Sequence, residues 1–183
     1  MLPIRDLFRR PASFEFTRNG KSVVATQREL TSQLVRLSQV TIADAGAPDE
    51  FSPIRLRPQE YRCYIYEWYH PAATLNVCVV ISPSEAVSGR IVELPVRQNF
   101  APHVPGVPVD SGEIIVELSN SSHKIDSGLG DGYYPVYAAK PLFGRPTAIA
   151  IDFKLWQTHG NIMLMDNQRF DEYGIVCIDD NPS

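Results

Sequence analysis

Residues 60–82, with the sequence EYRCYIYEWYHPAATLNVCVVIS, carry the strongest strand signal in the chain. Aromatic and β-branched residues dominate both halves of this segment, and such residues fit the pleated, half-buried surface of a sheet. His70-Pro71 separates the halves, so the segment predicts two neighbouring strands. Alternation assigns the side chains of the first strand to two faces: Tyr61, Cys63 and Ile65 on one, and Arg62, Tyr64 and Tyr66 on the other.

The densest group of aromatic residues, Tyr64, Tyr66, Trp68 and Tyr69, lies in the same segment. Because side chains alternate along a strand, part of this group must be buried and part exposed. We expect most of it to pack in the core. The alternative is an exposed patch that binds a sugar, a base or a protein.

Other segments show strand patterns of the same kind. Phe14 and Phe16 alternate with polar residues, and an apolar run from Val23 follows Asn19-Gly20. Asn-Gly between two such runs favours a β-hairpin, because both residues tolerate positive φ angles. The remaining strand candidates are residues 91–96, 113–119, 133–140, 147–156, 161–165 and 173–179.

One segment predicts a helix. In residues 27–40, QRELTSQLVRLSQV, the residues Leu30, Leu34 and Leu37 recur at helical spacing without Gly or Pro. An extended conformation is the alternative for the last part, residues 34–42. Turn signals elsewhere fall at the spacing of sandwiches and barrels, so we expect a mostly β fold, a β-sandwich or partly open barrel with about nine short strands and at most one or two short helices.

Two parts of the chain resemble one another. Residues 60–82 and 133–153 each contain an aromatic strand, a turn with proline and an apolar strand, and the spacing of Tyr61 and Tyr64 recurs in Tyr134 and Tyr137. One interpretation is a single β-rich domain over residues 1–183. The other divides it into two related β units packed face to face, at about 10–100 and 110–183.

Composition indicates a soluble protein that binds neither nucleic acid nor membrane. The net charge is -4 and the pI is about 5.5, whereas nucleic-acid binding depends on neutralising phosphates with Lys and Arg. No apolar run approaches the length of a membrane span, and the N-terminus carries early charges unlike a secretory signal, so we expect a cytoplasmic location. The acidic balance suits a basic protein partner. The basic group Arg5, Arg9 and Arg10 is expected to be a solvated turn rather than a binding patch.

Cysteine and histidine patterns offer no ready chemistry. Cys63, Cys78 and Cys177 each lie in an apolar run, so we expect buried, reduced thiols without a disulfide framework or zinc site. The histidines are scattered and lack metal-ligand spacing; they are His70, His103, His123 and His159. Asp-Ser-Gly occurs twice, around Ser111 and Ser127, but neither copy is the G-x-S-x-G elbow of hydrolases.

The glycine-rich stretch HKIDSGLGDGYYPVYAAK, residues 123–140, is the main candidate site. A phosphate loop is disfavoured, because the glycines lead into a strand pattern without Gly-Lys-Ser/Thr. A calcium site using Asp126 and Asp131 is an alternative. We favour a tight turn in which glycines take unusual φ angles and Asp126 and Ser127 cap backbone N–H groups, at an edge where a partner can dock. The candidate binding residues are Asp126, Ser127, Gly128, Gly130, Asp131, Gly132, Tyr133, Tyr134 and Tyr137. We expect no catalytic residue, no metal ligand and no cofactor.

Residues 126–153, DSGLGDGYYPVYAAKPLFGRPTAIAIDF, resemble a bacterial family of unassigned activity, domain-of-unknown-function family 4241. The resemblance rests on a Ser-Gly-x-Gly-Asp-Gly-x-Tyr-Pro-Val-Tyr segment, followed by a strand ending in Asp-Phe. The matching residues are Ser127, Gly128, Gly130, Asp131, Gly132, Tyr134, Pro135, Val136, Tyr137, Asp152 and Phe153. The family's Pro-Gly further upstream appears here as Pro58-Gln59. The resemblance implies a soluble, β-rich bacterial protein and suggests toxin neutralisation.

Three functional hypotheses follow. The first is a non-enzymatic binding protein, with a toxin-neutralising immunity protein as its specific form, whose contacts are the glycine-rich turn and the acidic C-terminal residues. Those acidic residues are Asp166, Asp171, Glu172, Asp179 and Asp180. The second is a small-ligand or metal-binding enzyme that uses Asp126 and Asp131 with a histidine. The third is a structural subunit of a larger assembly.

Overall fold

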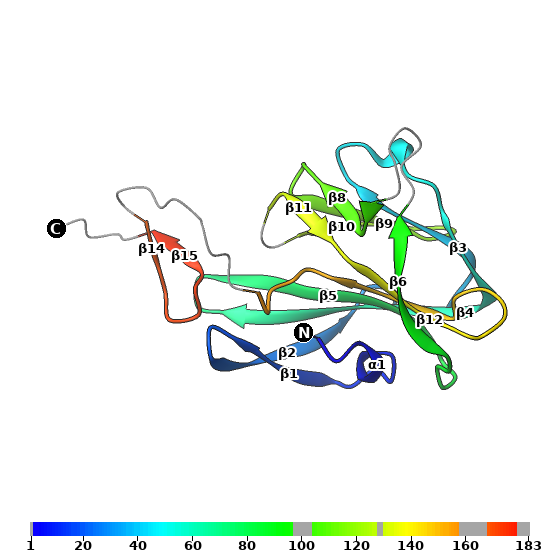
Figure 1. Cartoon of the computed structure of the whole chain (residues 1–183), viewed down its shortest axis with the longest axis horizontal. Coiled ribbons are helices and arrows are strands. Elements are labelled where there is room, and N and C mark those ends of the chain that lie inside the picture. The colour runs from blue at the N-terminus through cyan, green and yellow to red at the C-terminus, as the bar shows by residue number, and fades with distance from the viewer. Residues whose placement is uncertain (1, 97–103, 128–129, 158–167, 179–183) are drawn as a thin grey trace.

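The computed structural model describes residues 2–96, 104–127, 130–157 and 168–178, and these form a mostly β structure (Figure 1). One short helix, α1 (Ile4–Leu7), and one 3-10 turn, η1 (Pro48–Glu50), accompany the strands. None of the described helices is long and apolar enough to cross a membrane. The strands are β1 (Ser13–Arg18), β2 (Lys21–Glu29), β3 (Val35–Asp44), β4 (Ile54–His70), β5 (Ala73–Pro83), β6 (Arg90–Val96), β7 (Val104–Pro105), β8 (Val107–Val109), β9 (Glu113–Glu117), β10 (Ser122–Asp126), β11 (Gly132–Tyr134), β12 (Val136–Lys140), β13 (Ala148–Asp152), β14 (Gln168–Phe170) and β15 (Val176–Ile178).

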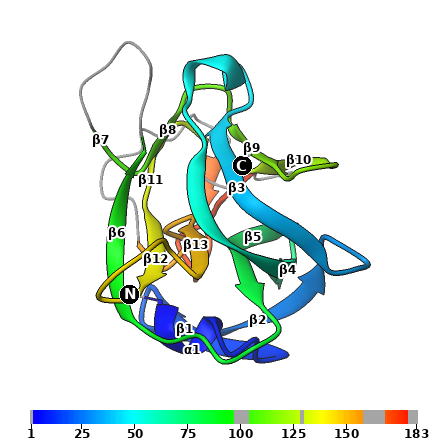
Figure 2. The same ribbon diagram turned by 90° about the vertical axis from the view of Figure 1, so that its right-hand side faces the viewer.

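The long strand β4 organises a large antiparallel sheet. One of its edges pairs with β5; the other pairs first with β3 and then, from Tyr64 to Glu67, with β2. The sheet continues on both sides in the order β10-β9-β3-β4-β5-β13-β12-β6-β7. Figure 2 shows the sheet curling around its interior, with the small β8–β11 ribbon beside β3. No pairing among the described strands closes this sheet into a barrel. The prediction of a mostly β fold is confirmed.

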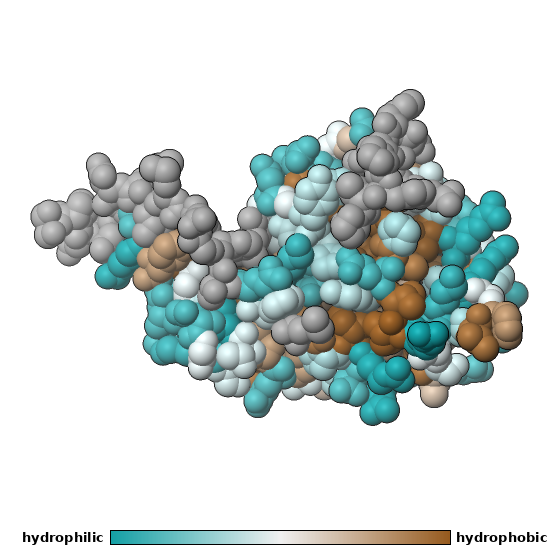
Figure 3. Space-filling model, viewed as in Figure 1, coloured by the Kyte–Doolittle hydropathy of each residue, from teal (hydrophilic) through white to brown (hydrophobic). Residues whose placement is uncertain are grey.

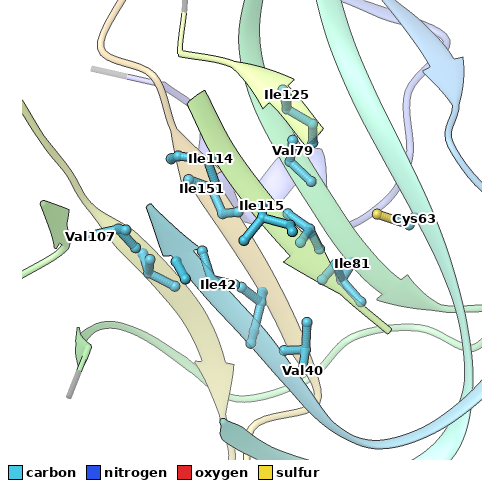
Figure 4. Packing of buried hydrophobic residues seen from close by; sticks show 14 of the residues in the cluster. Val40, Ile42, Cys63, Val79, Ile81, Val107, Ile114, Ile115, Ile125 and Ile151 are labelled. Carbon is cyan, nitrogen blue, oxygen red and sulfur yellow. The ribbon is translucent and has the colours of Figure 1, made fainter. Parts of the chain in front are cut away.

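Apolar residues cover both faces of the central strands. An inner core fills the concave side, where side chains from several strands point toward one another (Figure 4). An outer core packs between the convex side and the α1–β1–β2 segment. The predicted faces of β4 are confirmed for four residues: Tyr61, Cys63 and Ile65 belong to the inner core, and Tyr66 to the outer core, which also contains Trp68. Of the aromatic residues Tyr64, Tyr66, Trp68 and Tyr69, the first three are buried, as expected, and Tyr69 is exposed.

The hairpin prediction at Asn19-Gly20 is confirmed. β1 and β2 pair directly across these two residues, with Arg18 opposite Lys21. Asn19 and Gly20 have φ angles of 46° and 76°, the positive values that a tight two-residue hairpin loop requires.

The predicted helix over residues 27–40 is wrong. Its first part ends β2, its last part begins β3, and a loop joins them. The β3–β4 register shifts between Leu37 and Gln39, and the buried residues Leu37 and Val40 therefore lie three positions apart. The predicted stripe does not form one face: Leu30 and Leu34 lie in the β2–β3 connection, and Leu34 is exposed. Cross-strand packing of β3 decides the conformation.

The predicted strand over residues 133–140 is divided at Pro135. Tyr134 ends β11, which pairs with β8, and Val136 begins β12, which pairs with β6 and β13. Proline has no N–H for the ladder, so the chain changes partners there. The structure has more strands than the nine expected from the sequence. Residues 161–165, another strand candidate, lie outside the described residues.

The two similar segments form the β4–β5 and β12–β13 hairpins, and these lie side by side in one sheet because β5 pairs with β13. They do not face one another as two packed units would. Both interpretations, one domain over residues 1–183 or two related β units, stay predictions.

A buried guanidinium joins the first hairpin to the C-terminal part of the described chain. Arg18 donates hydrogen bonds to the carbonyl oxygens of Gln157, Tyr173 and Gly174 at 2.7, 2.9 and 3.1 Å, and also to that of Leu155. Burial lowers its pKa, while Asp171 opposes the shift. Four backbone carbonyls therefore surround one cation.

Candidate functional site

The glycine-rich stretch forms a turn that is anchored by Ser127. The Ser127 N–H donates to the carbonyl oxygen of Gly112 at 2.9 Å. Its buried hydroxyl lies 2.9 Å from the same oxygen and 2.8 Å from the carbonyl oxygen of Gly130. The Ser127 hydroxyl therefore donates to a carbonyl oxygen. The sequence predicts instead that this hydroxyl caps backbone N–H groups, and for Ser127 that prediction is wrong. The bonds hold residues 110–113 and 126–131 side by side.

Tyr134 anchors the same turn from the core. Its hydroxyl donates to the Gly130 carbonyl oxygen at 2.6 Å, and its ring packs edge-on against Phe153 with the ring centroids 5.7 Å apart. Burial raises the pKa of Tyr134, so the hydroxyl stays protonated and remains a donor. Gly130 has a φ of 78°, a conformation that favours glycine. Gly128 lies outside the described residues.

Four exposed carboxylates gather on the two anchored turns, and we call them the acidic rim: Asp110, Glu113, Asp126 and Asp131. Glu113 and Asp126 are direct partners in the β9–β10 register. Asp110 follows Val109, and Asp131 precedes Gly132, which is the register partner of Val109. Asp110 and Asp131 therefore leave the β8–β11 ribbon at the same end. The rim concentrates negative charge at one end of β8, β9, β10 and β11.

A hollow of about 370 Å³ adjoins the rim, and we call it the Asp44 hollow. It is lined by Asp44, Gly46, Ala47, Glu50, Phe51, Pro108, Asp110 and Ser111. Buried Asp44 accepts hydrogen bonds from the N–H groups of Gly46 and Asp110 at 3.0 and 2.9 Å, and from the Ser111 hydroxyl. Burial acts to raise the pKa of Asp44, but these hydrogen bonds outweigh it and hold the pKa below its ordinary value. The hollow therefore contains a stably ionised carboxylate.

The structure brings some predicted site residues together and separates others. Asp126, Ser127, Gly130, Asp131 and Gly132 form the turn, and Tyr133, in β11, is 53% exposed. Tyr134 supports this turn from the inner core. Tyr137 instead packs against the outer core.

The histidine that an enzyme built on Asp126 and Asp131 requires is not placed beside them among the described residues. His123 lies on β10, 3.2 Å from the Ser121 hydroxyl. His70 ends β4, is buried and is bound to Asp171. His103 and His159 lie outside the described residues. Within the described ranges, no three His, Cys, Asp or Glu side chains are grouped to hold a metal ion.

The predicted acidic C-terminal surface is only partly described. Asp166, Asp179 and Asp180 lie outside the described residues. Asp171 accepts the N–H groups of Tyr173 and Ile175 at 2.9 and 2.8 Å and binds His70. It therefore supports a local turn. Glu172 is exposed and pairs with Lys21.

Sequence reasoning missed Asp44, Glu50, Asp110 and Glu113 as parts of the site. A signal for two of them was present: Asp110 begins, and Glu113 directly follows, the first of the two Asp-Ser-Gly segments. The structure places Asp110 and Asp126, which begin the two copies, at the rim, and the Ser127 N–H bonds to the Gly112 carbonyl oxygen between them. No protein-family model, curated protein or solved structure matches this chain.

Proposed function

We propose that this protein binds a basic protein through the acidic rim and the Asp44 hollow, and that it acts by occupying that partner rather than by catalysis. The observation that carries the proposal is the gathering of four exposed carboxylates on two turns that Ser127 holds together. Charges fixed in this way are preorganised, so a partner loses little free energy in ordering them.

The rim brings two carboxylates face to face. Glu113 and Asp126 lie directly opposite one another in the β9–β10 register. A cationic side chain of a partner placed beside them would be attracted by both. Complementary charge also speeds association and rejects acidic competitors.

The Asp44 hollow suits a Lys or Arg side chain. Phe51 and Pro108 provide apolar wall for the methylene stem, while Asp44, Glu50 and Asp110 provide carboxylates for the charged end. Exposed Tyr133 adds an aromatic contact in the neighbouring ribbon. Aromatic residues are enriched at protein interfaces because they combine apolar area with a polar group.

The specific form of the proposal is a toxin-neutralising immunity protein. The resemblance of residues 126–153 to domain-of-unknown-function family 4241 suggests it, and a basic toxin encoded beside this chain is the expected partner. The rim, the hollow and Tyr133 form the surface that would block it.

Co-expression with the protein encoded by the adjacent gene tests both the binding of a basic partner and the neutralisation of a toxin. A growth assay reports neutralisation, and calorimetry at low and high salt reports affinity. The variant Asp110→Asn/Glu113→Gln/Asp126→Asn/Asp131→Asn should weaken binding about tenfold or more and flatten its salt dependence. Its matched control, Glu15→Gln/Glu60→Gln/Glu85→Gln/Glu93→Gln, removes the same charge from exposed positions elsewhere. Equal losses in both variants would refute a rim-specific site, and full binding without growth rescue would refute the immunity role alone.

A further inference from the structure

The β12–β13 hairpin exposes two large apolar side chains at its tip. Leu142 and Phe143 are 76% and 86% exposed, the highest values among the large hydrophobic residues that the structure describes. The hairpin projects at the right-hand edge of Figure 1, and brown atoms stand at the same place in Figure 3. Adjacent exposed apolar residues on a projecting loop indicate an interaction site.

The tip is held in a defined conformation. Pro141 and Pro146 flank it and restrict the backbone on both sides. The Thr147 N–H donates to the Ala139 carbonyl oxygen at 2.9 Å, which closes the hairpin. The Arg57 N–H donates to the Pro146 carbonyl oxygen at 2.9 Å, which fastens it to β4. The apolar side chains are therefore presented outward without a large entropic cost on binding.

Five exposed cations lie on the hairpin or on segments that contact it, and we call them the basic collar: Arg5, Arg57, Arg90, Lys140 and Arg145. Lys140 and Arg90 are direct register partners. The Arg5 guanidinium lies 3.4 Å from the Gly89 carbonyl oxygen, and Gly89 packs against the Lys140 backbone. None of the five forms an ion pair with any carboxylate in the described part of the chain. The like charges of Lys140 and Arg90 repel one another unless an anion lies nearby.

Few carboxylates of the described chain lie near the collar, and the nearest in sequence, Asp6, follows Arg5 and pairs with Arg9. Glu93, on β6, is three register pairs away from Arg90, about 10 Å along the strand. Glu85 lies in the β5–β6 connection that also contains Gly89. The acidic rim belongs to different turns, at the ends of β8 to β11. A protein of net charge -4 thus carries a local excess of positive charge around two exposed apolar residues.

We infer that the tip and the basic collar form an insertion site for an anionic lipid surface. Leu142 and Phe143 would enter the boundary between headgroups and acyl chains, while the five cations contact lipid phosphates and carboxylates. This combination supplies both signals that stable binding at a bilayer surface needs, an apolar insertion and a basic cluster. Two exposed apolar side chains with cations nearby suit an anionic lipid surface, because a bilayer offers both an apolar interior and negatively charged headgroups. The inference departs from the expectation of no membrane partner and is independent of the acidic rim.

Vesicle co-sedimentation of the full chain tests the inference. The vesicles consist of phosphatidylcholine and phosphatidylserine in about equal parts, with pure phosphatidylcholine vesicles as the comparison. We expect binding to the anionic vesicles, weakened about fivefold by each collar cation that is removed, as in Arg57→Gln and Arg90→Gln. Leu142→Ser/Phe143→Ser should weaken binding tenfold or more, since it removes the apolar insertion. The control Val24→Ser/Tyr69→Ser changes two apolar residues exposed elsewhere and should bind like the unchanged chain.

Fluorescence of Phe143→Trp gives a second measurement that does not depend on sedimentation. The emission of this tryptophan should shift to the blue with anionic vesicles and stay constant with pure phosphatidylcholine. Several results would overturn the inference: no binding to anionic vesicles, equal binding to both compositions, or a tip variant that binds like its control. A partner protein with an acidic pocket would give the first of these results.

Discussion

The N–H and the hydroxyl of Ser127 both lie 2.9 Å from the carbonyl oxygen of Gly112. These residues belong to the two Asp-Ser-Gly segments of the chain, so one short contact joins the turn after β8 to the turn after β10. Strand pairing places Glu113 opposite Asp126 and brings Asp110 and Asp131 to the same end of the β8–β11 ribbon. The Ser127–Gly112 contact then joins these two pairs of carboxylates into the acidic rim.

Replacing Ser127 with alanine should therefore loosen both turns. The substitution removes a buried hydroxyl that donates its one proton to the Gly112 or the Gly130 carbonyl oxygen, and we expect a loss of about 1–2 kcal/mol in the free energy of unfolding. Urea denaturation measures it. Ser22→Ala is the matched control, because the Ser22 hydroxyl makes an exposed bond to Glu15, and its effect should stay within about 0.5 kcal/mol. Equal stability of the two variants would contradict the anchoring role of Ser127.

Asp44 should stabilise the fold in a pH-dependent manner. Its pKa in the folded chain lies below the ordinary value of 3.8, so the folded state favours the carboxylate. This contribution is complete above the pKa of the unfolded chain and is lost as the pH falls through the lower folded-state pKa. Asp44→Asn should cost about 1–3 kcal/mol at neutral pH, since an amide donor then faces the N–H of Asp110 or Gly46.

Chemical denaturation of Asp44→Asn and the unchanged chain at neutral pH, and again below pH 3.8, measures the difference. The two stabilities should converge in acid. A difference that stays constant over this range would show that the carboxylate charge has no part in the stability.

Gly106 should tolerate alanine far less than Gly20 does. Both have positive φ angles, 81° and 76°. A Cβ on Gly106 would lie 2.5 Å from the Tyr134 carbonyl oxygen, whereas a Cβ on Gly20 would meet nothing within 4 Å. Gly20→Ala should therefore cost about 1–2 kcal/mol from backbone strain alone. Gly106→Ala adds a backbone clash and should cost about 3 kcal/mol or more. Thermal unfolding of both variants provides the comparison, and similar losses would contradict the close approach of β8 to β11.

The three cysteines should react in a fixed order. Burial raises the pKa of Cys63 to about 12 and that of Cys78 well above its ordinary value, so neither forms the reactive thiolate in the folded chain. Cys177 is partly exposed. Iodoacetamide in native buffer should modify Cys177 alone, and all three in urea, as read by peptide mass spectrometry. Modification of Cys63 under native conditions would contradict its burial.

The central sheet could be predicted because its signals are local. Residues 60–82 combine aromatic and β-branched residues with alternation, and the structure forms β4 and β5 there. Asn19-Gly20 likewise specifies its turn through backbone conformation alone. Residues 27–40 misled because the spacing of Leu30, Leu34 and Leu37 is helical, although the first two lie in the β2–β3 connection and only Leu37 lies in a strand. The strand conformation depends on pairing with β4, which is distant in sequence.

The candidate site could be predicted only in part. The glycine-rich turn could be predicted because closely spaced glycines indicate a turn, and Gly130 has a positive φ there. Asp44 and Glu113 enter the site through strand pairing between segments distant in sequence, which composition and spacing do not encode. The basic collar illustrates the same limit: Arg5 was expected to be a solvated residue of the N-terminal turn, yet folding brings it near Lys140.

The carbonyl cage of Arg18 has a consequence for synthesis on the ribosome. The guanidinium leaves the tunnel long before its acceptors, which follow 137 to 156 residues later. Until these acceptors emerge, the Arg18 guanidinium of the first hairpin has only water to accept its hydrogen bonds. The four hydrogen bonds that fix the β1–β2 layer to the later part of the chain can therefore be complete only after Gly174 has emerged from the tunnel.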